Sequence, residues 1–186
     1  MCKIAYPRAL QFYNAEQLYY GVQQCRWIAS LYMEHDHNHY MNLAYQEALK
    51  ACDEGEVPVG AVIVHEGRIV GRGYNRVEAL QDATAHAEIV AIGAASSSLD
   101  SWRLEKCRLY VTLEPCLMCL GAILQCRIET LIYGASDPRL GAITAHNYAE
   151  TAKNAYNRFP GIISGIMANE SSYLIKSFFE KIRKKN

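Results

Sequence analysis

Two short segments of this sequence combine metal-binding side chains with a carboxylate. They are Thr84-Ala85-His86-Ala87-Glu88-Ile89 and Thr112-Leu113-Glu114-Pro115-Cys116-Leu117-Met118-Cys119. Cys116 and Cys119 lie three positions apart, so they share one face of a helical turn and both sulfurs can bind one ion. With His86 as third ligand, a tetrahedral zinc ion would keep its fourth position for water, which is the arrangement of a catalytic zinc site.

Both segments are expected at the start of a helix, and this position matters for their chemistry. Helix N-termini carry partial positive charge, which lowers the pKa of a thiol and favours thiolate ligands. Glu88 follows His86 by two positions, and on a helix this offset directs its side chain away from the ligand direction. We therefore expect Glu88 beside the metal, where a carboxylate can take a proton from water and return it to a departing amine.

Other roles for these residue types were weighed against a catalytic zinc. A structural zinc would need a fourth ligand, from Cys52, Cys107 or Cys126. Cys107 and Cys126 flank elements where a small buried apolar residue suits the core, so both are interpreted as core thiols. Glu114 is a further candidate acid, but we favour a structural role in which it ends a strand and bonds nearby backbone. A His-x-Glu followed by Pro-Cys-x-x-Cys is the signature of zinc-dependent nucleobase deaminases, and this joint pattern favours a catalytic zinc.

The elements that must position these segments alternate between helix and strand. Apolar residues at helical spacing predict a helix from about 40 to 54. Strands are predicted over 58–64, 69–74, 107–113, 128–133 and 161–167, and helices over about 84–95, 116–125, within 136–158 and over 170–184. Thr84 is the expected cap of the second helix, and Pro115 is expected to open the third. The predicted fold class is α/β, a three-layer α/β/α domain on a mixed sheet of five strands with one antiparallel pair, the hairpin over 58–74.

Composition bounds the class of protein and its setting. The 186 residues suggest one domain, and the 51% apolar content can form a core. Lys plus Arg equals Asp plus Glu at 19 each, so net charge gives no indication of a nucleic-acid partner. No apolar run reaches the roughly 18 residues of a membrane span, and no secretory signal is evident. We therefore expect a cytoplasmic protein with no membrane partner, whose cysteines are thiols or metal ligands.

Residues 1–38 differ from the rest and are interpreted as an N-terminal extension, with the domain proper over 39–186. The extension is rich in Tyr and Gln and ends in the polar run Glu34-His35-Asp36-His37-Asn38-His39. Its alternating histidines could bind a metal, but a solvated tail is favoured. Met33 or Met41 could also serve as the start of the chain.

Residues from about 40 to 183 resemble bacterial tRNA adenosine deaminases, which are members of the zinc-dependent cytidine and deoxycytidylate deaminase superfamily. Deaminases of free guanine, cytosine, deoxycytidylate or the riboflavin precursor share the zinc motifs but usually diverge towards the C-terminus. Beyond the two zinc-motif segments, the resemblance is carried by Glu56-Val57-Pro58-Val59-Gly60-Ala61, Gly73-Tyr74-Asn75-Arg76, Tyr110-Val111, Gly134-Ala135-Ser136-Asp137, Gly165-Ile166-Met167-Ala168-Asn169-Glu170 and Phe178-Phe179.

The resemblance implies a cytidine-deaminase-like fold and a role for each matching residue. One Zn²⁺ per subunit would be bound by His86, Cys116 and Cys119, with Glu88 as the proton shuttle. The implied contacts to the target nucleoside or its RNA are Asn75, Val57, Pro58, the backbone N–H of Ala87, and Asp137. Two alternatives stay open, because Asn75 could simply end a strand and Asp137-Pro138 is a common turn starter.

The implied reaction is the hydrolytic conversion of adenosine to inosine at the wobble position of a tRNA anticodon stem-loop, from an arginine tRNA. Splaying a base out of its stack costs least in such an unstacked loop. The family is usually a homodimer. Basic residues of the last helix are candidates for phosphate contact or for a solvated face: Lys176, Lys181, Arg183, Lys184 and Lys185.

The chain departs from the family at two positions, and two other functions remain in competition. Gln81 and Ala83 stand where the family often has His and Pro, which could alter RNA contacts without changing the chemistry. The same zinc chemistry could act on a free base or nucleotide such as guanine. A catalytically silent RNA-binding or scaffold subunit is the third interpretation, against which the intact Glu88 argues.

Overall fold

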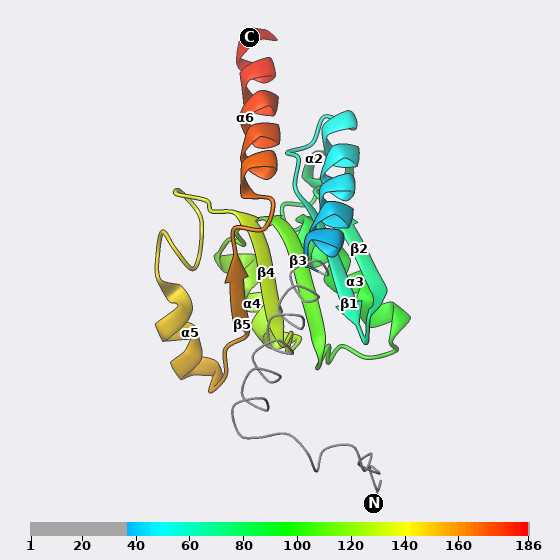
Figure 1. Cartoon of the computed structure of the whole chain (residues 1–186), viewed down its shortest axis with the longest axis vertical. Coiled ribbons are helices and arrows are strands. Elements are labelled where there is room, and N and C mark those ends of the chain that lie inside the picture. The colour runs from blue at the N-terminus through cyan, green and yellow to red at the C-terminus, as the bar shows by residue number, and fades with distance from the viewer. Residues whose placement is uncertain (1–36, 186) are drawn as a thin grey trace, which may run out of the picture. The chain divides into compact units, whose positions relative to one another are not determined.

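The structure, a computed structural model, describes residues 37–185, and the expectations for residues 1–36 lie outside this range. The first described element is a helix over 37–53. The elements that follow are β1 (Gly60–His65), β2 (Arg68–Tyr74), α2 (Val77–Leu80), α3 (Ala87–Ser98), β3 (Cys107–Leu113), α4 (Leu117–Gln125), β4 (Thr130–Ala135), α5 (Tyr148–Tyr156), β5 (Gly161–Ser164) and α6 (Ala168–Lys185) (Figure 1). No helix among the described residues is both long and apolar enough to cross a membrane.

The five strands form one mixed sheet in the order β2-β1-β3-β4-β5. β3 pairs parallel with β4, and β4 pairs parallel with β5, as expected for strands joined through helices. β1 pairs antiparallel with β2 and also with β3, so the expectation of a single antiparallel pair was wrong. The reason is the long connection through α3, which passes from β2 over β1 to β3. β2 and β3 therefore run parallel to each other with β1 between them.

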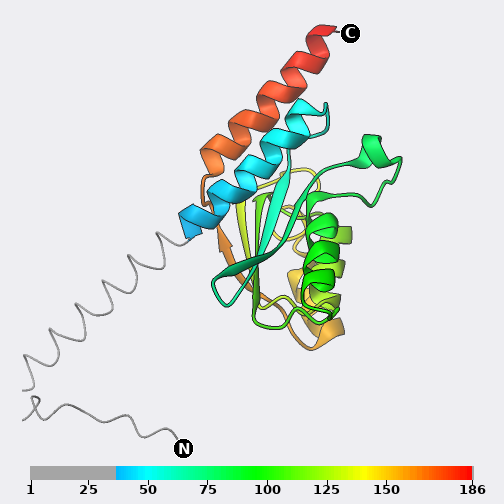
Figure 2. The same cartoon turned by 90° about the vertical axis from the view of Figure 1, so that its right-hand side faces the viewer.

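Helices cover both faces of the sheet and make the predicted three layers. The helix over 37–53 and α6 lie on one face, whereas α3 and α4 lie on the other (Figure 2). β1 is buried on both sides, with Ala61 and Ile63 in the cluster that includes the alanines of α3. Val62 and Val64 instead join Met41 in the cluster beneath the first helix. Burial on both faces explains why this strand reads as a continuous apolar run.

Several helix starts differ from the expected positions. His86 is the N-cap of α3 and Cys116 is the N-cap of α4. Thr84 does not cap α3, because its backbone N–H and hydroxyl both donate to Asp82 Oδ1 at 2.8 and 2.7 Å. Pro115 lies two positions before the first residue of α4, so the expected proline start was also wrong. These shifts place one zinc-ligand candidate at the cap of each helix.

The first helix includes residues that the sequence assigned to a solvated extension. His37 is 7% exposed, and its Nδ1 lies 3.0 Å from the hydroxyl of the core residue Tyr110. The hydroxyl of the neighbouring Tyr40 donates to the carbonyl of Gly67 at 2.8 Å. The compact unit correspondingly begins at His37.

Close packing of α3 on β2 is possible because β2 contains glycines that face the helix. A Cβ built on Gly73 would lie 2.4 Å from the carbonyl oxygen of Ala87 and 2.5 Å from the backbone nitrogen of Ala91. A Cβ on Gly71 would lie 2.4 Å from the carbonyl oxygen of Ala91. The strand backbone thus touches the helix backbone, and this contact fixes the start of α3 against the sheet.

We expect Gly73→Ala to destabilise the fold, because the added methyl group meets backbone that cannot move aside. The expected loss in the free energy of unfolding is about 1–3 kcal/mol, as for other overpacked sites. The measurement is urea unfolding followed by circular dichroism. Gly161→Ala in β5 is the matched control, since the nearest atom to its Cβ is 3.8 Å away. Equal stability of the two variants would contradict the close contact between β2 and α3.

Candidate active site

His86, Cys116 and Cys119 come together with the geometry of a metal site. The three ligand atoms lie within 4.8 Å of one another. His86 Nδ1 is 3.8 Å from Cys116 Sγ and 3.5 Å from Cys119 Sγ. A tetrahedral zinc ion about 2.3 Å from sulfur and about 2.0–2.1 Å from nitrogen would separate these atoms by about 3.6 Å. One histidine nitrogen and two thiol sulfurs at these distances fit Zn²⁺, so the predicted ligand set is confirmed.

The surroundings of the two cysteines favour a thiolate. The hydrogen bond from Cys119 and the contact with His86 lower the pKa of Cys116 to about 4, and the pKa of Cys119 is raised by the same contact with Cys116 and by burial. The pKa of His86 is raised by its contact with Cys116. A cation at their centre would favour the thiolate form of both sulfurs, as thiolate ligation requires.

Glu88 is buried next to the triad without belonging to it. Its side chain is 4% exposed and lies in the first turn of α3. Burial raises the pKa of this carboxyl group, which also interacts with Cys119. A carboxyl group with a raised pKa beside a metal site is suited to moving a proton.

The expected nucleoside contacts lie on segments that are tied to the start of α3. The backbone N–H of Arg76 donates to the carbonyl of Ala85 at 2.9 Å, next to His86. Asn75, which precedes Arg76, is 7% exposed, and its N–H donates to the carbonyl of Val59 at 3.0 Å. This second bond joins Asn75 to the segment that carries Pro58, which is buried, and Val57, which is half-buried. Ala87 is the first residue of α3, so its N–H has no acceptor within the helix.

Sequence reasoning missed the residue that orients Asn75. The carboxylate of Glu56 is 2% exposed and accepts from Asn75 Nδ2 at 3.2 Å. Glu56 also accepts from the backbone N–H of Ala79 in α2 at 2.8 Å. Because the amide nitrogen of Asn75 is engaged, its oxygen is left as the group that can accept a bond from a substrate. No local pattern could have signalled Glu56, because its partners lie 19 and 23 positions away.

Asp137 and Glu114 both organise the loop beyond β4. Asp137 Oδ1 accepts from the backbone N–H of Arg139 at 2.8 Å and of Leu140 at 3.1 Å, which is the geometry of a turn starter. Its proposed contact with RNA stays a prediction. Glu114 bonds the backbone of the same loop, as the sequence favoured, and it is 3% exposed.

The remaining described cysteines do not join the metal site. Among the residues that the structure describes, one group has metal-binding geometry, and Cys52, Cys107 and Cys126 are outside it. Burial raises the pKa of Cys107 and of Cys126 to about 11 in each case. Both are core thiols, as expected, and neither adds a fourth ligand to the triad.

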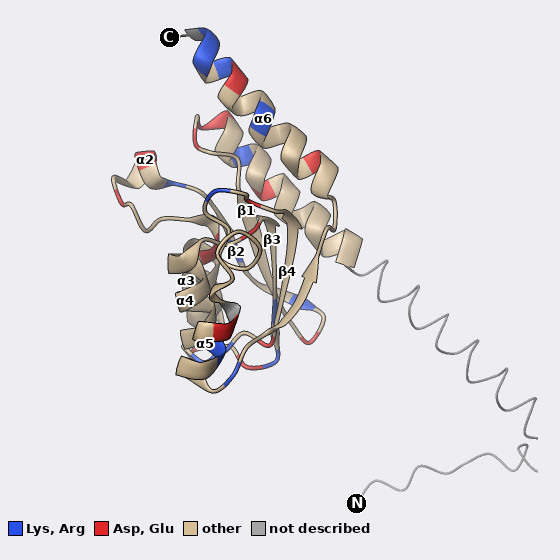
Figure 3. Cartoon of the chain, turned by 90° about the vertical axis from the view of Figure 1, so that its left-hand side faces the viewer, with Lys and Arg blue, Asp and Glu red and all other residues tan. Residues whose placement is uncertain are grey.

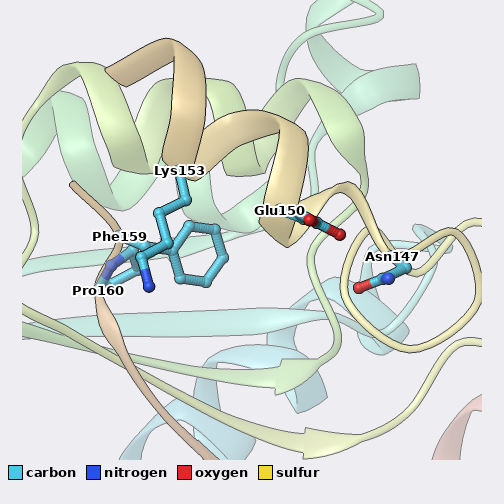
Figure 4. Close-up of a pocket in the computed structure, with 5 residues that line it drawn as sticks. All are labelled: Asn147, Glu150, Lys153, Phe159 and Pro160. Atoms are coloured by element: carbon cyan, nitrogen blue, oxygen red, sulfur yellow. The ribbon is translucent and has the colours of Figure 1, made fainter. Parts of the chain in front are cut away.

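Two other surface features of interest lie away from the triad. A hollow of about 500 Å³ beside α5 is lined by Asn147, Glu150, Lys153, Phe159 and Pro160 (Figure 4). It contains none of the metal ligands or expected substrate contacts. Basic residues gather at the C-terminal end of α6 (Figure 3). In that helix Phe178 is buried and Phe179 is 40% exposed, so only one of the paired phenylalanines belongs to the core.

Comparisons with known proteins all place this chain among the deaminases. Residues 34–135 match the cytidine and deoxycytidylate deaminase zinc-binding region. The tRNA-specific adenosine deaminase of Bacillus subtilis is 42% identical over 147 residues, which cover 78% of this chain and 90% of that protein. The chloroplastic tRNA(adenine(34)) deaminase of Arabidopsis thaliana is 59% identical over 103 residues, but the match spans 8% of its length.

Solved structures agree with these sequence relatives. A structure from studies of A-to-I editing by tRNA:A34 deaminases superposes with a TM-score of 0.70 at 43% identity and covers 73% of this chain and 98% of that chain. Guanine deaminase from Bacillus subtilis is 40% identical with a TM-score of 0.51, over 53% of this chain and 63% of that chain. The likeness to guanine deaminase is therefore less extensive along both chains.

Substitutions at His86 and Glu88 should separate metal binding from proton transfer. We expect His86→Ala to lose zinc, because two thiolates alone hold the ion far less well. Glu88→Ala should retain one zinc ion per chain, since its carboxylate is outside the ligand triad. Zinc content after dialysis, measured by atomic emission, checks both. Loss of zinc from Glu88→Ala would make Glu88 a ligand and remove it as the proton carrier.

Proposed function

This chain belongs to the cytidine and deoxycytidylate deaminase family, and within it to the tRNA-specific adenosine deaminases, and from this membership we propose that it deaminates adenosine 34 of a tRNA to inosine. The observation that carries the proposal is the His86, Cys116 and Cys119 triad in a chain that matches 90% of a tRNA-specific adenosine deaminase. The C6–N bond of adenine breaks, a C6–O bond forms, and one water is consumed as ammonia is released.

The residues around the metal divide the chemistry between them. A zinc ion held by His86, Cys116 and Cys119 would supply Lewis acidity, which lowers the pKa of a bound water to near 7 in favourable sites. The carboxylate of Glu88 takes the proton of the attacking water and transfers it to the ring nitrogen N1. It then carries a proton to the departing amine. Burial of Glu88 supports this role, because an unsolvated carboxyl group accepts and releases a proton without reorganising water.

The proposed base pocket uses residues on both sides of the start of α3. The N–H of Ala87 donates to the purine edge, and the amide oxygen of Asn75 accepts a bond from the nucleoside. Val57 and Pro58 form an apolar wall for the base. The bond from Asn75 Nδ2 to Glu56 supports this assignment, because it holds the amide in one orientation.

The proposed RNA surface surrounds this pocket. Asp137 would lie at its rim, and the basic residues of α6 would contact phosphates. Gln81 and Ala83 are exposed, so the two departures from the family lie where they can touch RNA without altering the metal site. We propose the anticodon stem-loop of an arginine tRNA as the substrate.

The proposed compartment is the cytoplasm, where free thiols such as Cys107 and Cys126 stay reduced. The Arabidopsis relative is chloroplastic by name, so an organelle is the other compartment in which such an enzyme acts.

We also propose that the chain forms a homodimer through the outer surface of α3 and α4. α4 is apolar on every side, yet Leu117 is 53% exposed. Gly93 and Ala94 are exposed on the outside of α3, and a Cβ on Gly121 of α4 would meet nothing within 4 Å. An apolar helix surface of this kind is normally covered, and small residues let a second copy approach closely.

An arginine anticodon stem-loop with adenosine at the wobble position is the expected substrate. The zinc-loaded chain should release ammonia and form inosine there, and Glu88→Ala should lower kcat by about 10²–10⁴-fold, the usual contribution of an acid–base group. The measurement is inosine formation by mass spectrometry, with free adenine, adenosine, guanine and cytosine offered in parallel. Ammonia from free guanine, with the stem-loop unchanged, would move the chain to the small-molecule deaminases.

Gly121→Arg should convert the proposed dimer to a monomer. The long side chain projects from open surface on α4, so it leaves the fold of one chain intact while it blocks a second copy. Sedimentation velocity measures the oligomeric state. Ala155→Arg adds the same charge to the exposed surface of α5 and should leave the dimer intact. A dimer that persists in Gly121→Arg would place the interface elsewhere.

A further inference from the structure

Glu114 is a buried carboxylate to which the proposed reaction assigns no role. It follows β3 directly, two positions before the zinc ligand Cys116, and is 3% exposed. Its own backbone N–H donates to the carbonyl of Ala135 at the end of β4, at 2.8 Å. The residue is therefore fixed at the edge of the sheet from which the metal-binding turn begins.

The carboxylate of Glu114 collects four hydrogen bonds from a single loop, residues 137–144. Oε2 accepts from the backbone N–H of Asp137 at 3.0 Å and from the hydroxyl of Thr144 at 2.5 Å. Oε1 accepts from the backbone N–H groups of Ile143 and Thr144 at 3.0 and 2.7 Å. These donors come from both ends of the loop, so one buried anion closes it. A buried anion that loses such donors is strongly disfavoured, which makes the arrangement rigid.

The loop wraps around this carboxylate at contact distance. A Cβ built on Gly141 would lie 2.5 Å from the carboxyl carbon and from Oε2 of Glu114. The neighbouring Ala142 donates its N–H to the carbonyl of Pro115 at 3.0 Å. Since Pro115 precedes Cys116, the loop is bonded to the metal-binding turn at a second point.

The loop, which is bonded to the metal-binding turn at Pro115, presents two exposed side chains. Leu140 is 55% exposed and Arg139 is exposed. Their backbone is held by Asp137, whose Oδ1 caps the turn. In the proposed complex, the nucleotides next to the bound base would pass over this loop. A guanidinium group suits their phosphates, and an exposed leucine suits the face of a base.

We propose that Glu114 is a positioning residue that couples the zinc-binding turn to the loop 137–144, and so sets where Arg139 and Leu140 meet the RNA. The inference rests on the proposed tRNA substrate and deepens it. Glu114 acts through the loop and does not touch the reacting atoms.

The first test is Glu114→Gln, which replaces one carboxylate oxygen with an NH₂ group that faces N–H donors. We expect one zinc per chain, a single-turnover rate at saturating stem-loop within about 3-fold of wild type, and a Kd for the stem-loop raised at least 10-fold. Backbone amides of residues 143 and 144 should exchange with deuterium faster. Loss of zinc, or a lowered single-turnover rate with unchanged Kd, would overturn the assignment. Unchanged amide exchange would also overturn it, whatever the RNA does.

A double-mutant cycle distinguishes positioning from general destabilisation. Arg139→Ala should weaken stem-loop binding in the wild-type background and have little further effect in Glu114→Gln, because the guanidinium group is already misplaced. Fully additive effects would show that Glu114 does not act through Arg139.

Variants of Thr144 keep the test available if Glu114→Gln fails to fold. Thr144→Val removes one of the four bonds and should raise the Kd for the stem-loop by a smaller factor than Glu114→Gln does. Thr144→Ser retains the hydroxyl and should bind the stem-loop as the wild type does. Equal binding by the valine and serine variants would count against the carboxylate as the organiser of the loop. A wild-type chain that binds and deaminates no stem-loop would instead reject the proposed function, and this inference with it.

Discussion

A single zinc ion requires its ligands to lie about 3.6 Å apart, and much of the structure serves to bring two helices together at that spacing. His86 follows β2 and Cys116 follows β3, two strands that run parallel, so both ligand-bearing segments emerge at the same edge of the sheet. The helices can reach each other there because α3 packs directly on the strand backbone at Gly71 and Gly73. Because His86 and Cys116 occupy the N-cap positions of α3 and α4, both helix N-termini, with their partial positive charge, begin at the zinc ligands.

The described domain buries four carboxylates, those of Glu47, Glu56, Glu88 and Glu114, and they differ in what stabilises them. Glu47 forms ion pairs with Lys50 at 2.7 Å and Arg72 at 3.1 Å, which is a structural use of the charge. Glu56 and Glu114 accept hydrogen bonds from neutral groups of neighbouring segments of the chain. Glu88 instead lies in the first turn of α3 beside the zinc ligands, and burial raises its pKa. The environment thus separates carboxylates that hold loops in place from the one suited to proton transfer.

The reacting groups and the proposed recognition groups sit on different kinds of structure. The zinc ligands and Glu88 occupy the first turns or caps of helices that are anchored to the sheet, where their positions are tightly constrained. Asn75 and Arg139 lie on connecting segments that are held by Glu56 and Glu114. Such segments can change in sequence while the metal site is retained, which accords with the shorter likeness to guanine deaminase than to the tRNA:A34 deaminase structure.

The sequence by itself determined the zinc ligands and the order of the elements apart from the short helix α2, because these depend on short repeats of residue type that a helix or strand converts directly into geometry. The positions of helix starts shifted by a few residues, because side chains such as Thr84 bonded to a turn instead of a helix. Only the tertiary structure placed β1 between β2 and β3, joined His37 to Tyr110 across 73 positions, and gathered the 137–144 loop around Glu114. Those arrangements depend on contacts between distant parts of the chain, and no local pattern specifies which buried acid will meet which backbone N–H.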